Sequence, residues 1–100
     1  MEGQAYVDAV LCAVEQIPPG RVLSYGDVAE LVGVGGPRQV GHIMATHGGV
    51  VPWWRVVRAD GSTAVRKQAG QLALLAREGC PLRAGGERVD MTRARWDGVV

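Results

Sequence analysis

Large apolar residues recur at helical spacing in the first part of the chain. Between Gly3 and Gln16 they fall three or four positions apart, so they would share one face of a helix. This helix must end before Pro18-Pro19-Gly20, since proline cannot continue it. The predicted core stripe of the helix, with its continuation just beyond the end, consists of Tyr6, Val7, Val10, Leu11, Val14 and Ile17.

Two shorter amphipathic segments follow, joined by a glycine-rich turn. The first is capped by Ser24, with Asp27 three positions later as in a capping box, and continues to about Val32. The second begins with Pro37, whose missing N–H is not needed in the first turn, and ends at about His47. We expect burial of Val28, Ala29, Leu31 and Val32 in the first segment and of Val40, Ile43 and Met44 in the second, with Arg38, Gly41, His42 and Ala45 outside.

Extended segments and turns alternate in the second half of the chain. We predict an extended segment over Val50–Arg58 with Val56 and Val57 buried, a turn at Ala59–Ser62, and a short strand or loop to about Val65. Two helices followed by strand–turn–strand predict a mainly α fold with short β-hairpins, a winged helix or helix-turn-helix domain. The remaining expected elements are a helix over Gln68–Arg77 with Leu72, Leu75 and Ala76 inward, and a small hairpin over Leu82–Met91.

The length of 100 residues fits one small domain, which we expect to span residues 1–100. Cys12, Cys80, His42 and His47 do not have metal-ligand spacing, so we expect no metal and no cofactor. Two buried thiols are the simplest state of the cysteines, and a single disulfide is the alternative. Without a membrane-length apolar stretch or a signal sequence, the chain is expected to be a soluble intracellular protein, and we expect it to be a monomer.

Charge is unevenly distributed, although the net charge is only +1. Residues 1–30 contain five acidic residues and one basic residue, whereas residues 31–77 contain six basic residues and one acidic residue. Ten of the eleven basic residues are arginine, the side chain suited to bidentate phosphate and base contacts. This distribution is compatible both with a positive nucleic-acid-binding face and with an ordinary solvated surface.

Five short motifs occur in an order that is typical of one protein family. They are Ile17-Pro18-Pro19-Gly20-Arg21-Val22, Ser24-Tyr25-Gly26-Asp27-Val28-Ala29, Arg38-Gln39-Val40-Gly41, Pro52-Trp53-Trp54-Arg55-Val56-Val57 and Leu74-Leu75-Ala76-Arg77-Glu78-Gly79. Together they resemble the DNA-binding domain of the O6-alkylguanine-DNA alkyltransferases, the methylated-DNA–protein-cysteine methyltransferase family, over about residues 6–79. Residues 80–100 lie outside this shared core. A segment within them, Glu87-Arg88-Val89-Asp90 with an end near Trp96, is similar to the tail of the non-catalytic branch, the alkyltransferase-like proteins. The resemblance implies an alkyltransferase C-terminal-domain-like fold.

The catalytic motif of this family is altered at two adjacent positions. Active members carry Pro-Cys-His-Arg, in which the thiolate attacks the alkyl group and a histidine, held by a glutamate, draws off the thiol proton through water. Here Trp53 and Trp54 occupy the cysteine and histidine positions, and only Glu78 remains. An indole has no ionisable thiol and is no base at neutral pH, so the resemblance implies a non-catalytic protein. We expect Trp54 to pack beneath the site, Arg55 to be structural, and Glu78 to cap a helix or pair with a cation.

The resemblance also assigns DNA-binding roles within the helical pair. Tyr25 corresponds to the tyrosine that crowds a phosphate and helps to rotate the nucleotide. Arg38 corresponds to the arginine that fills the space left in the duplex. Gly41 leaves one face of its helix low, which would allow close approach to a minor groove, and Gln39 and His42 complete the expected DNA-binding set.

A pocket for the altered base is expected around the changed motif. The resemblance predicts that Tyr25, Pro52, Trp53, Val56 and Arg66 line it, with Arg66 in the segment that closes it. An aromatic contact with an extruded base contributes about 1–3 kcal/mol, and the indole of Trp53 could supply one. The alternative, which we favour less, is that Trp53 is a core-filling aromatic.

Three functions compete for this sequence. The first, which the resemblance implies, is a non-catalytic protein that docks its helix-turn-helix in the minor groove of double-stranded DNA, flips O6-alkylguanine, and hands the lesion to nucleotide excision repair proteins. The second is an alkyltransferase that uses Cys12 or Cys80 as its nucleophile. The third is a winged-helix transcription factor, which would require a base-reading helix and usually a dimer surface. We favour the first.

Overall fold

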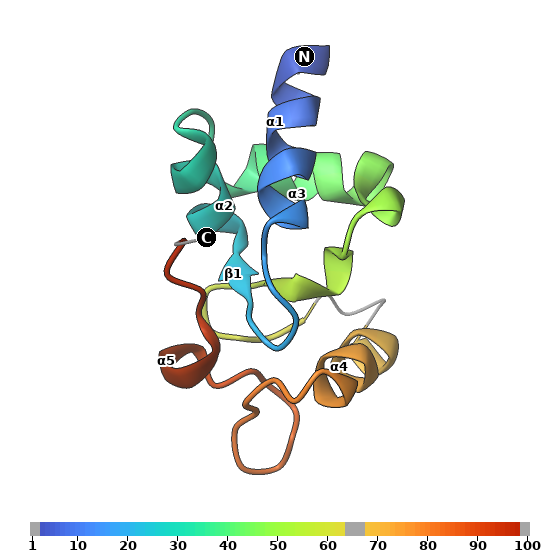
Figure 1. Cartoon of the computed structure of the whole chain (residues 1–100), viewed down its shortest axis with the longest axis vertical. Helices are drawn as coiled ribbons and strands as arrows, with labels where there is room; N and C mark the ends of the chain where they lie inside the picture. The colour runs from blue at the N-terminus through green and yellow to red at the C-terminus, as the bar shows by residue number, and fades with distance from the viewer. Residues whose placement is uncertain (1–2, 64–67, 99–100) are drawn as a thin grey trace.

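The computed structural model describes residues 3–63 and 68–98, and three helices form its upper half (Figure 1). These are α1 (Gln4–Glu15), α2 (Tyr25–Val32) and α3 (Pro37–His47). The predicted helices are confirmed, with boundaries that agree within one residue. The predicted capping box is also present, because Ser24 Oγ accepts from the Asp27 N–H at 3.0 Å and Asp27 Oδ2 accepts from the Ser24 N–H at 3.0 Å.

A short parallel sheet lies between the upper and lower halves of the molecule. It consists of β1 (Leu23–Ser24) and β2 (Val56–Val57), with Leu23 paired to Val56 and Ser24 to Val57. Successive side chains of a strand point to opposite faces, so Leu23 and Val56 pack upward while Val57 packs downward. The sheet therefore separates two clusters of buried side chains.

The upper cluster joins the three helices to the sheet, and the lower cluster joins the sheet to the C-terminal third of the chain. The upper cluster contains Val7, Val10, Ala13, Val14, Ile17, Leu23, Val28, Ala29, Val40, Ile43, Met44, Val51, Val56 and Trp96. The lower cluster contains Val22, Val57, Leu75, Cys80, Val89 and Ala94. Burying this apolar surface is the main driving force for holding the two halves together.

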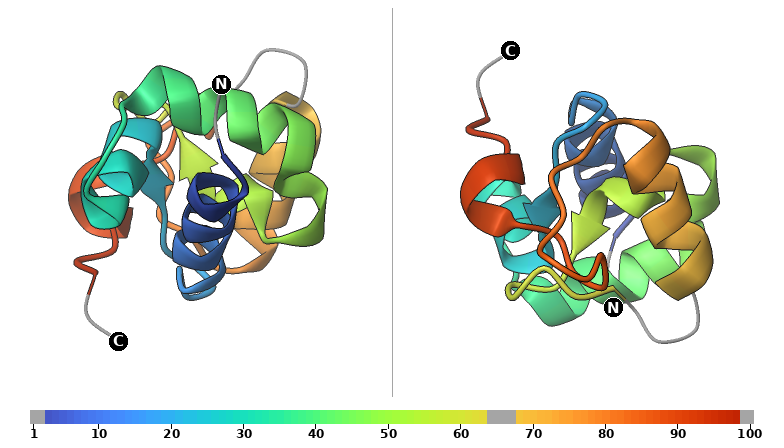
Figure 2. Two further views of the ribbon diagram at one scale, coloured as in Figure 1. Left: turned by 90° about the horizontal axis from the view of Figure 1, so that it is seen from above. Right: turned by 90° about the horizontal axis from the view of Figure 1, so that it is seen from below.

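The lower half is built from α4 (Gln68–Arg77), α5 (Met91–Ala94) and the segment between them. Seen from below, α4 and α5 lie on opposite sides of the sheet (Figure 2). The predicted hairpin is confirmed by an antiparallel bridge between Leu82 and Val89. The predicted bounds of α4 are confirmed as well, whereas the short helix α5 was not predicted.

The predicted extended segment over Val50–Arg58 is wrong except at β2. Two 3-10 turns, η1 (Gly48–Val50) and η2 (Trp53–Arg55), take up most of it. The strand–turn–strand expected after the helices is also absent from the described residues, because β2 pairs in parallel with β1 and not with the chain that follows it. Pairing with a strand more than thirty residues earlier depends on the tertiary fold, and short-range sequence patterns do not reveal it.

Three burial predictions are also corrected. Leu31, expected inside, is 43% exposed at the outer end of α2, and Ala76 is exposed on α4. Cys12, expected to be a buried thiol, is exposed on α1, whereas Cys80 is buried, and both are free.

The polar side chain of Gln71 is buried on α4, where it is only 2% exposed. It donates to the carbonyls of Trp54 at 3.1 Å and Val56 at 2.8 Å, so its burial leaves no unpaired amide N–H.

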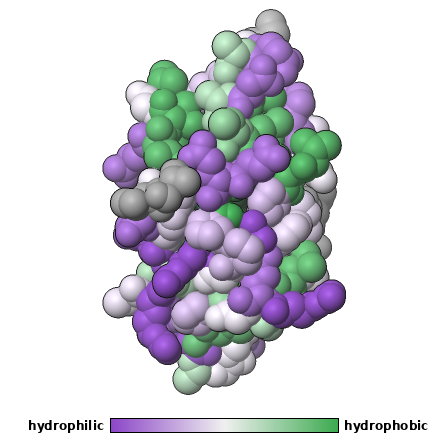
Figure 3. All heavy atoms as spheres, in the orientation of Figure 1, coloured by the Kyte–Doolittle hydropathy of each residue, from purple (hydrophilic) through white to green (hydrophobic). Residues whose placement is uncertain are grey.

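The surface carries small separate apolar patches and no dominant one on the face shown in Figure 3. The exposed large apolar side chains of the described residues are Leu31, Val34 and Val50. Scattered apolar residues of this kind are normal on a folded protein. The described helices are too short or too polar for any of them to cross a membrane.

Candidate functional site

Tyr25 and Arg58 lie side by side at the end of the parallel strand pair. The register of β1 and β2 pairs Ser24 with Val57, so Tyr25 and Arg58 are the next residues on each strand. Tyr25 is half-buried against the upper cluster, and burial raises the pKa of its phenol while the nearby Arg58 charge lowers it, with a net rise. Tyr25 is therefore a neutral hydrogen-bond donor at physiological pH. Arg58 is exposed beside it.

The outer face of α3 carries the other predicted DNA-binding residues. Arg38 is exposed in the first turn, and it makes no hydrogen bond or ion pair with another described residue. Gln39 is exposed too, but its Oε1 accepts from the Gly36 N–H at 3.0 Å, so this amide caps the helix. A Cβ built on Gly41 would meet nothing within 4 Å, so this part of the helix surface is open. His42 is exposed one position further along.

The predicted pocket residues lie around η2 and β2. Pro52 precedes η2, and Trp53 begins it, half-buried against the upper cluster. Val56 is 1% exposed and belongs to the upper cluster, so in this structure it is a core residue. Arg66 lies outside the described residues, and with it the segment expected to close the pocket. The pocket therefore remains a prediction.

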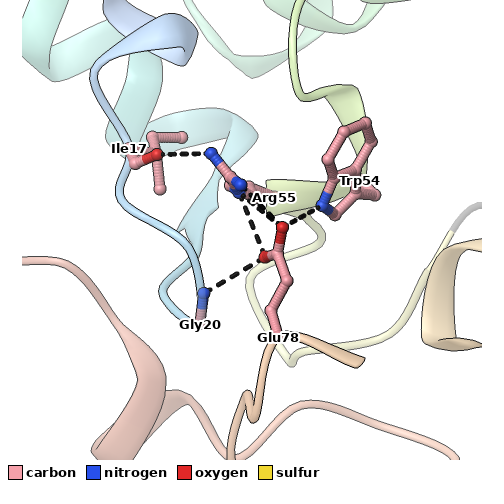
Figure 4. Close-up of polar contacts among 5 residues, drawn as sticks. All are labelled: Ile17, Gly20, Trp54, Arg55 and Glu78. Carbon is pink, nitrogen blue, oxygen red and sulfur yellow. Dashed lines mark hydrogen bonds and ion pairs between the residues drawn. The ribbon is translucent and has the colours of Figure 1, made fainter. Parts of the chain in front are cut away.

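Glu78 is the centre of a hydrogen-bonded cluster beneath η2 (Figure 4). Its Oε2 accepts from Trp54 Nε1 at 2.9 Å and from Arg55 Nη2 at 2.6 Å. Its Oε1 accepts from Arg55 Nε at 3.1 Å and from the Gly20 N–H at 3.1 Å. Arg55 Nη1 also donates to the Ile17 carbonyl at 2.9 Å. The cluster thus ties the loop after α1 to η2 and to the end of α4.

The charge state of Glu78 follows from these contacts. Burial raises the pKa of the carboxyl, but hydrogen bonds from Arg55, Trp54 and the Gly20 backbone outweigh it and lower the pKa below the ordinary 4.5. Glu78 is therefore ionised at neutral pH, and both of its oxygens are already engaged. It acts as a structural anion that holds Trp54 and Arg55.

The two adjacent indoles lie at right angles to each other. The ring centroids of Trp53 and Trp54 are 5.8 Å apart, with an interplanar angle of 88°. Trp53 packs against the upper cluster, whereas Trp54 packs against the lower one. The guanidinium carbon of Arg55 lies 5.3 Å from the centroid of the Trp54 ring. The motif therefore contains an edge-to-face aromatic pair.

The two cysteines lie on different parts of the fold, with Cys12 on α1 and Cys80 in the cluster against which Trp54 packs. Cys80 is buried in the lower cluster, and burial together with the Glu78 charge raises the pKa of its thiol to about 11. Since the thiolate is the reactive form, Cys80 is a poor nucleophile at neutral pH. Cys12 is exposed on α1, where its sulfur lies 3.6 Å from Gln16 Nε2. No group of three potential metal ligands occurs within residues 3–63 and 68–98.

Two residues beside the predicted site residues were not singled out from the sequence. Arg58 follows the buried pair Val56-Val57, and a cation directly after a predicted strand could have marked it. Gln71 supports η2 through its bonds to the Trp54 and Val56 carbonyls. Nothing in its sequence context distinguishes it from an exposed helical glutamine.

Similarity to known proteins covers almost the whole chain. Residues 5–80 match the family described as 6-O-methylguanine DNA methyltransferase, DNA binding domain. The DNA base-flipping protein of Escherichia coli (strain K12) is 40% identical over 90 residues, which cover 84% of this chain and 68% of that protein. The crystal structure of S. pombe Atl1 in complex with damaged DNA containing O6-carboxymethylguanine has a TM-score of 0.82 at 28% identity, over 97% of this chain and 99% of that chain.

A third match is to a methyltransferase. A variant of the M. tuberculosis O6-methylguanine methyltransferase has a TM-score of 0.66 at 30% identity, over 84% of this chain and 55% of that chain. The Atl1 match confirms the predicted fold class, a mainly helical helix-turn-helix domain like the alkyltransferase C-terminal domain.

Proposed function

Because this chain belongs to the family of the 6-O-methylguanine DNA methyltransferases, through their DNA-binding domain, we propose that it recognises O6-alkylguanine in duplex DNA without transferring the alkyl group. The observation that carries the proposal is the pair Trp53 and Trp54, which replaces both nucleophile and base. The carboxylate of Glu78, the remaining residue of the relay, already accepts hydrogen bonds from Trp54 and Arg55. Relatives named DNA base-flipping protein, and Atl1 bound to damaged DNA, support this reading.

Binding begins with docking of α3 in the minor groove. The open surface at Gly41 allows close approach of the helix, and Arg38 enters the duplex in place of the extruded nucleotide. A guanidinium suits this role because it stacks on a neighbouring base and donates to the orphaned partner. Tyr25 crowds the phosphate as a neutral phenol, and the adjacent Arg58 charge attracts the same phosphate.

The extruded base then enters a pocket at the altered motif. Trp53 offers its indole to the base, and the contact is sequence-tolerant because every base has a π-face. Pro52 and Arg66 complete the lining, while Val56 supports it from the core. Taking the base out of the stack costs a few kcal/mol, and the protein recovers this cost from stacking and phosphate contacts.

The bound complex marks the lesion for other proteins. In this proposal the monomeric chain acts inside the cell and hands the lesion to nucleotide excision repair proteins. Resemblance to the non-catalytic branch supports this step.

Binding and mass measurements on one sample test the proposal. The protein is titrated with a duplex carrying one O6-methylguanine and with the same duplex undamaged, and its mass is measured after incubation. We expect tighter binding to the damaged duplex and an unchanged protein mass. A gain of one methyl group would show alkyl transfer to the protein, as the alternative with Cys12 or Cys80 as nucleophile requires, and equal affinity for both duplexes would exclude damage recognition.

Arg38→Ala tests the intercalating role directly. We expect a loss of about 1–3 kcal/mol in binding the damaged duplex, because a stacked cation is removed. Arg83→Ala, at an exposed arginine of the distant hairpin, is the matched control and should bind like the unchanged protein. An Arg38→Ala variant with full affinity would remove Arg38 from the mechanism.

A further inference from the structure

We propose that Trp54 is a positioning residue for damage recognition, because it fixes the ring of Trp53 that meets the extruded base. The inference rests on the proposed function and adds a role for the second altered position of the motif. It is carried by the anchoring of Trp54 and by the perpendicular contact between the two indoles.

Trp54 is anchored on three sides. Its Nε1–H donates to Glu78 Oε2 at 2.9 Å, its ring lies 5.3 Å from the Arg55 guanidinium carbon, and its carbonyl accepts from Gln71 Nε2 at 3.1 Å. Glu78 is itself held by Arg55 and by the Gly20 N–H. Hydrogen bonds to charged groups are among the stronger ones in proteins, so the orientation of this indole is well determined.

The fixed indole then defines the position of its neighbour. Trp53 meets Trp54 edge to face, with 5.8 Å between centroids and 88° between ring planes. Rotation of the Trp53 side chain about its Cα–Cβ bond would break this contact and the packing against the upper cluster. Trp53 is thus held before DNA arrives, and a preorganised ring saves the conformational entropy that binding would otherwise cost.

The anchor lies on the side of the motif away from the described DNA-binding residues. Glu78 lines a polar groove of about 350 Å³ together with Arg21 and Arg93, on the lower half of the molecule. Trp54 packs against the lower cluster, whereas Tyr25 packs against the upper one. Trp54 is therefore expected to act on the lesion only through Trp53, and its loss should spare binding to undamaged DNA.

Two substitutions of Trp54 test separately its ring contact with Trp53 and its hydrogen bond to Glu78. Trp54→Leu removes the edge-to-face partner, whereas Trp54→Phe keeps an aromatic ring but loses the N–H that Glu78 accepts. We expect Trp54→Leu to weaken binding to the O6-methylguanine duplex by about two- to tenfold, the range for loss of one aromatic pair. Trp54→Phe should lie between Trp54→Leu and the unchanged protein. Affinity for the undamaged duplex should stay the same in both.

Trp96→Phe is the matched control, because it removes an indole from the upper cluster away from the motif. It should lower the melting temperature but keep the preference for the damaged duplex. The inference is overturned if Trp54→Leu keeps the full preference, or if Trp96→Phe loses as much of it, which would show a general packing effect. If the unchanged protein has no preference for the damaged duplex, the proposed function fails and the inference fails with it.

Discussion

At the scale of single residues, Trp54 keeps one property of a histidine and lacks another. An indole N–H can donate to Glu78 as an imidazole N–H can, and here it does so at 2.9 Å. An imidazole also has a second nitrogen that accepts a proton, whereas indole is a donor only. Trp54 therefore donates the hydrogen bond to Glu78 but cannot act as a general base.

This difference predicts the behaviour of a restored nucleophile. Trp53→Cys alone should give little or no methyl transfer from O6-methylguanine DNA, because no neighbouring base generates the thiolate and an ordinary cysteine thiol, with a pKa of about 8.5, is mostly protonated at neutral pH. The double variant Trp53→Cys/Trp54→His should transfer measurably faster. Protein mass after timed incubation gives both rates. Equal rates for the two variants would show that Trp54 is not the missing base position.

At the scale of secondary structure, α3 has favourable residues at its N-terminus and one residue of low helix propensity in its interior. Pro37 starts the helix and the Gln39 amide caps it, but Gly41 costs about 1 kcal/mol relative to alanine in a helix interior. The cost has no packing reason within the described residues, since a Cβ there would meet nothing within 4 Å. Close approach to DNA is the reason that we propose.

Gly41→Gln should therefore change stability and binding in opposite directions. The free energy of unfolding should rise by about 0.5–1 kcal/mol, since glutamine is the better helix former, while affinity for both duplexes falls because the side chain blocks docking. Gly70→Gln on α4, where a Cβ also meets nothing within 4 Å, is the control and should raise stability alone. Denaturant melts and DNA titrations measure the two effects. Unchanged affinity in Gly41→Gln would mean that α3 does not approach the groove closely.

At the scale of the whole molecule, the Glu78 cluster joins segments from both halves of the chain. The Ile17 carbonyl and the Gly20 N–H lie after α1, Arg55 lies on η2, and Glu78 follows α4. The side chains of Arg55 and Glu78 are only 13% and 15% exposed. Removing one partner leaves the other charge partly buried, so the cluster matters more than a surface ion pair.

Glu78→Gln should reveal this contribution through its pH dependence. The pKa of Glu78 is lowered by folding, so its stabilisation is fully present above its ordinary pKa of 4.5 and is lost as pH falls through the lowered folded value. We expect the unchanged protein to exceed the variant by about 1–3 kcal/mol at neutral pH, with the difference shrinking below pH 4.5. Denaturant melts across this range measure it. Glu87→Gln, at an exposed hairpin position, should show no such difference, and a pH-independent gap for Glu78→Gln would contradict the assignment.

Among the described arginines, some form ion pairs within the protein and others face outward, and this difference predicts the salt dependence of DNA binding. Arg88 pairs with Asp60 at 3.7 Å, whereas Arg58 is exposed beside Tyr25. Arg58→Ala should weaken binding to both duplexes and reduce the slope of log K against log salt by about 1, as for one lost phosphate contact. Arg88→Ala should leave the slope unchanged. The same slope in Arg58→Ala would place Arg58 outside the DNA interface.

Much of the helical framework could be predicted because its determinants are local. The caps at Ser24 and Pro37, the stop at Pro18, and the spacing of apolar residues act within a few positions, and the structure confirms the helices that they predict. Short-range patterns failed for β2, whose partner β1 lies far back in the chain. They also failed for Leu31, because a helical face is buried only where another element covers it.

The sequence by itself determined that Trp53 and Trp54 can supply neither a thiolate nor a base, whatever surrounds them. Only the tertiary structure decided what these two side chains contact. The partners of Trp54 come from distant segments, with Glu78 beyond α4 and the supporting Gly20 after α1. Chain folding brings these groups within hydrogen-bond reach, and that proximity turns two substitutions in a motif into a fixed pair of indoles.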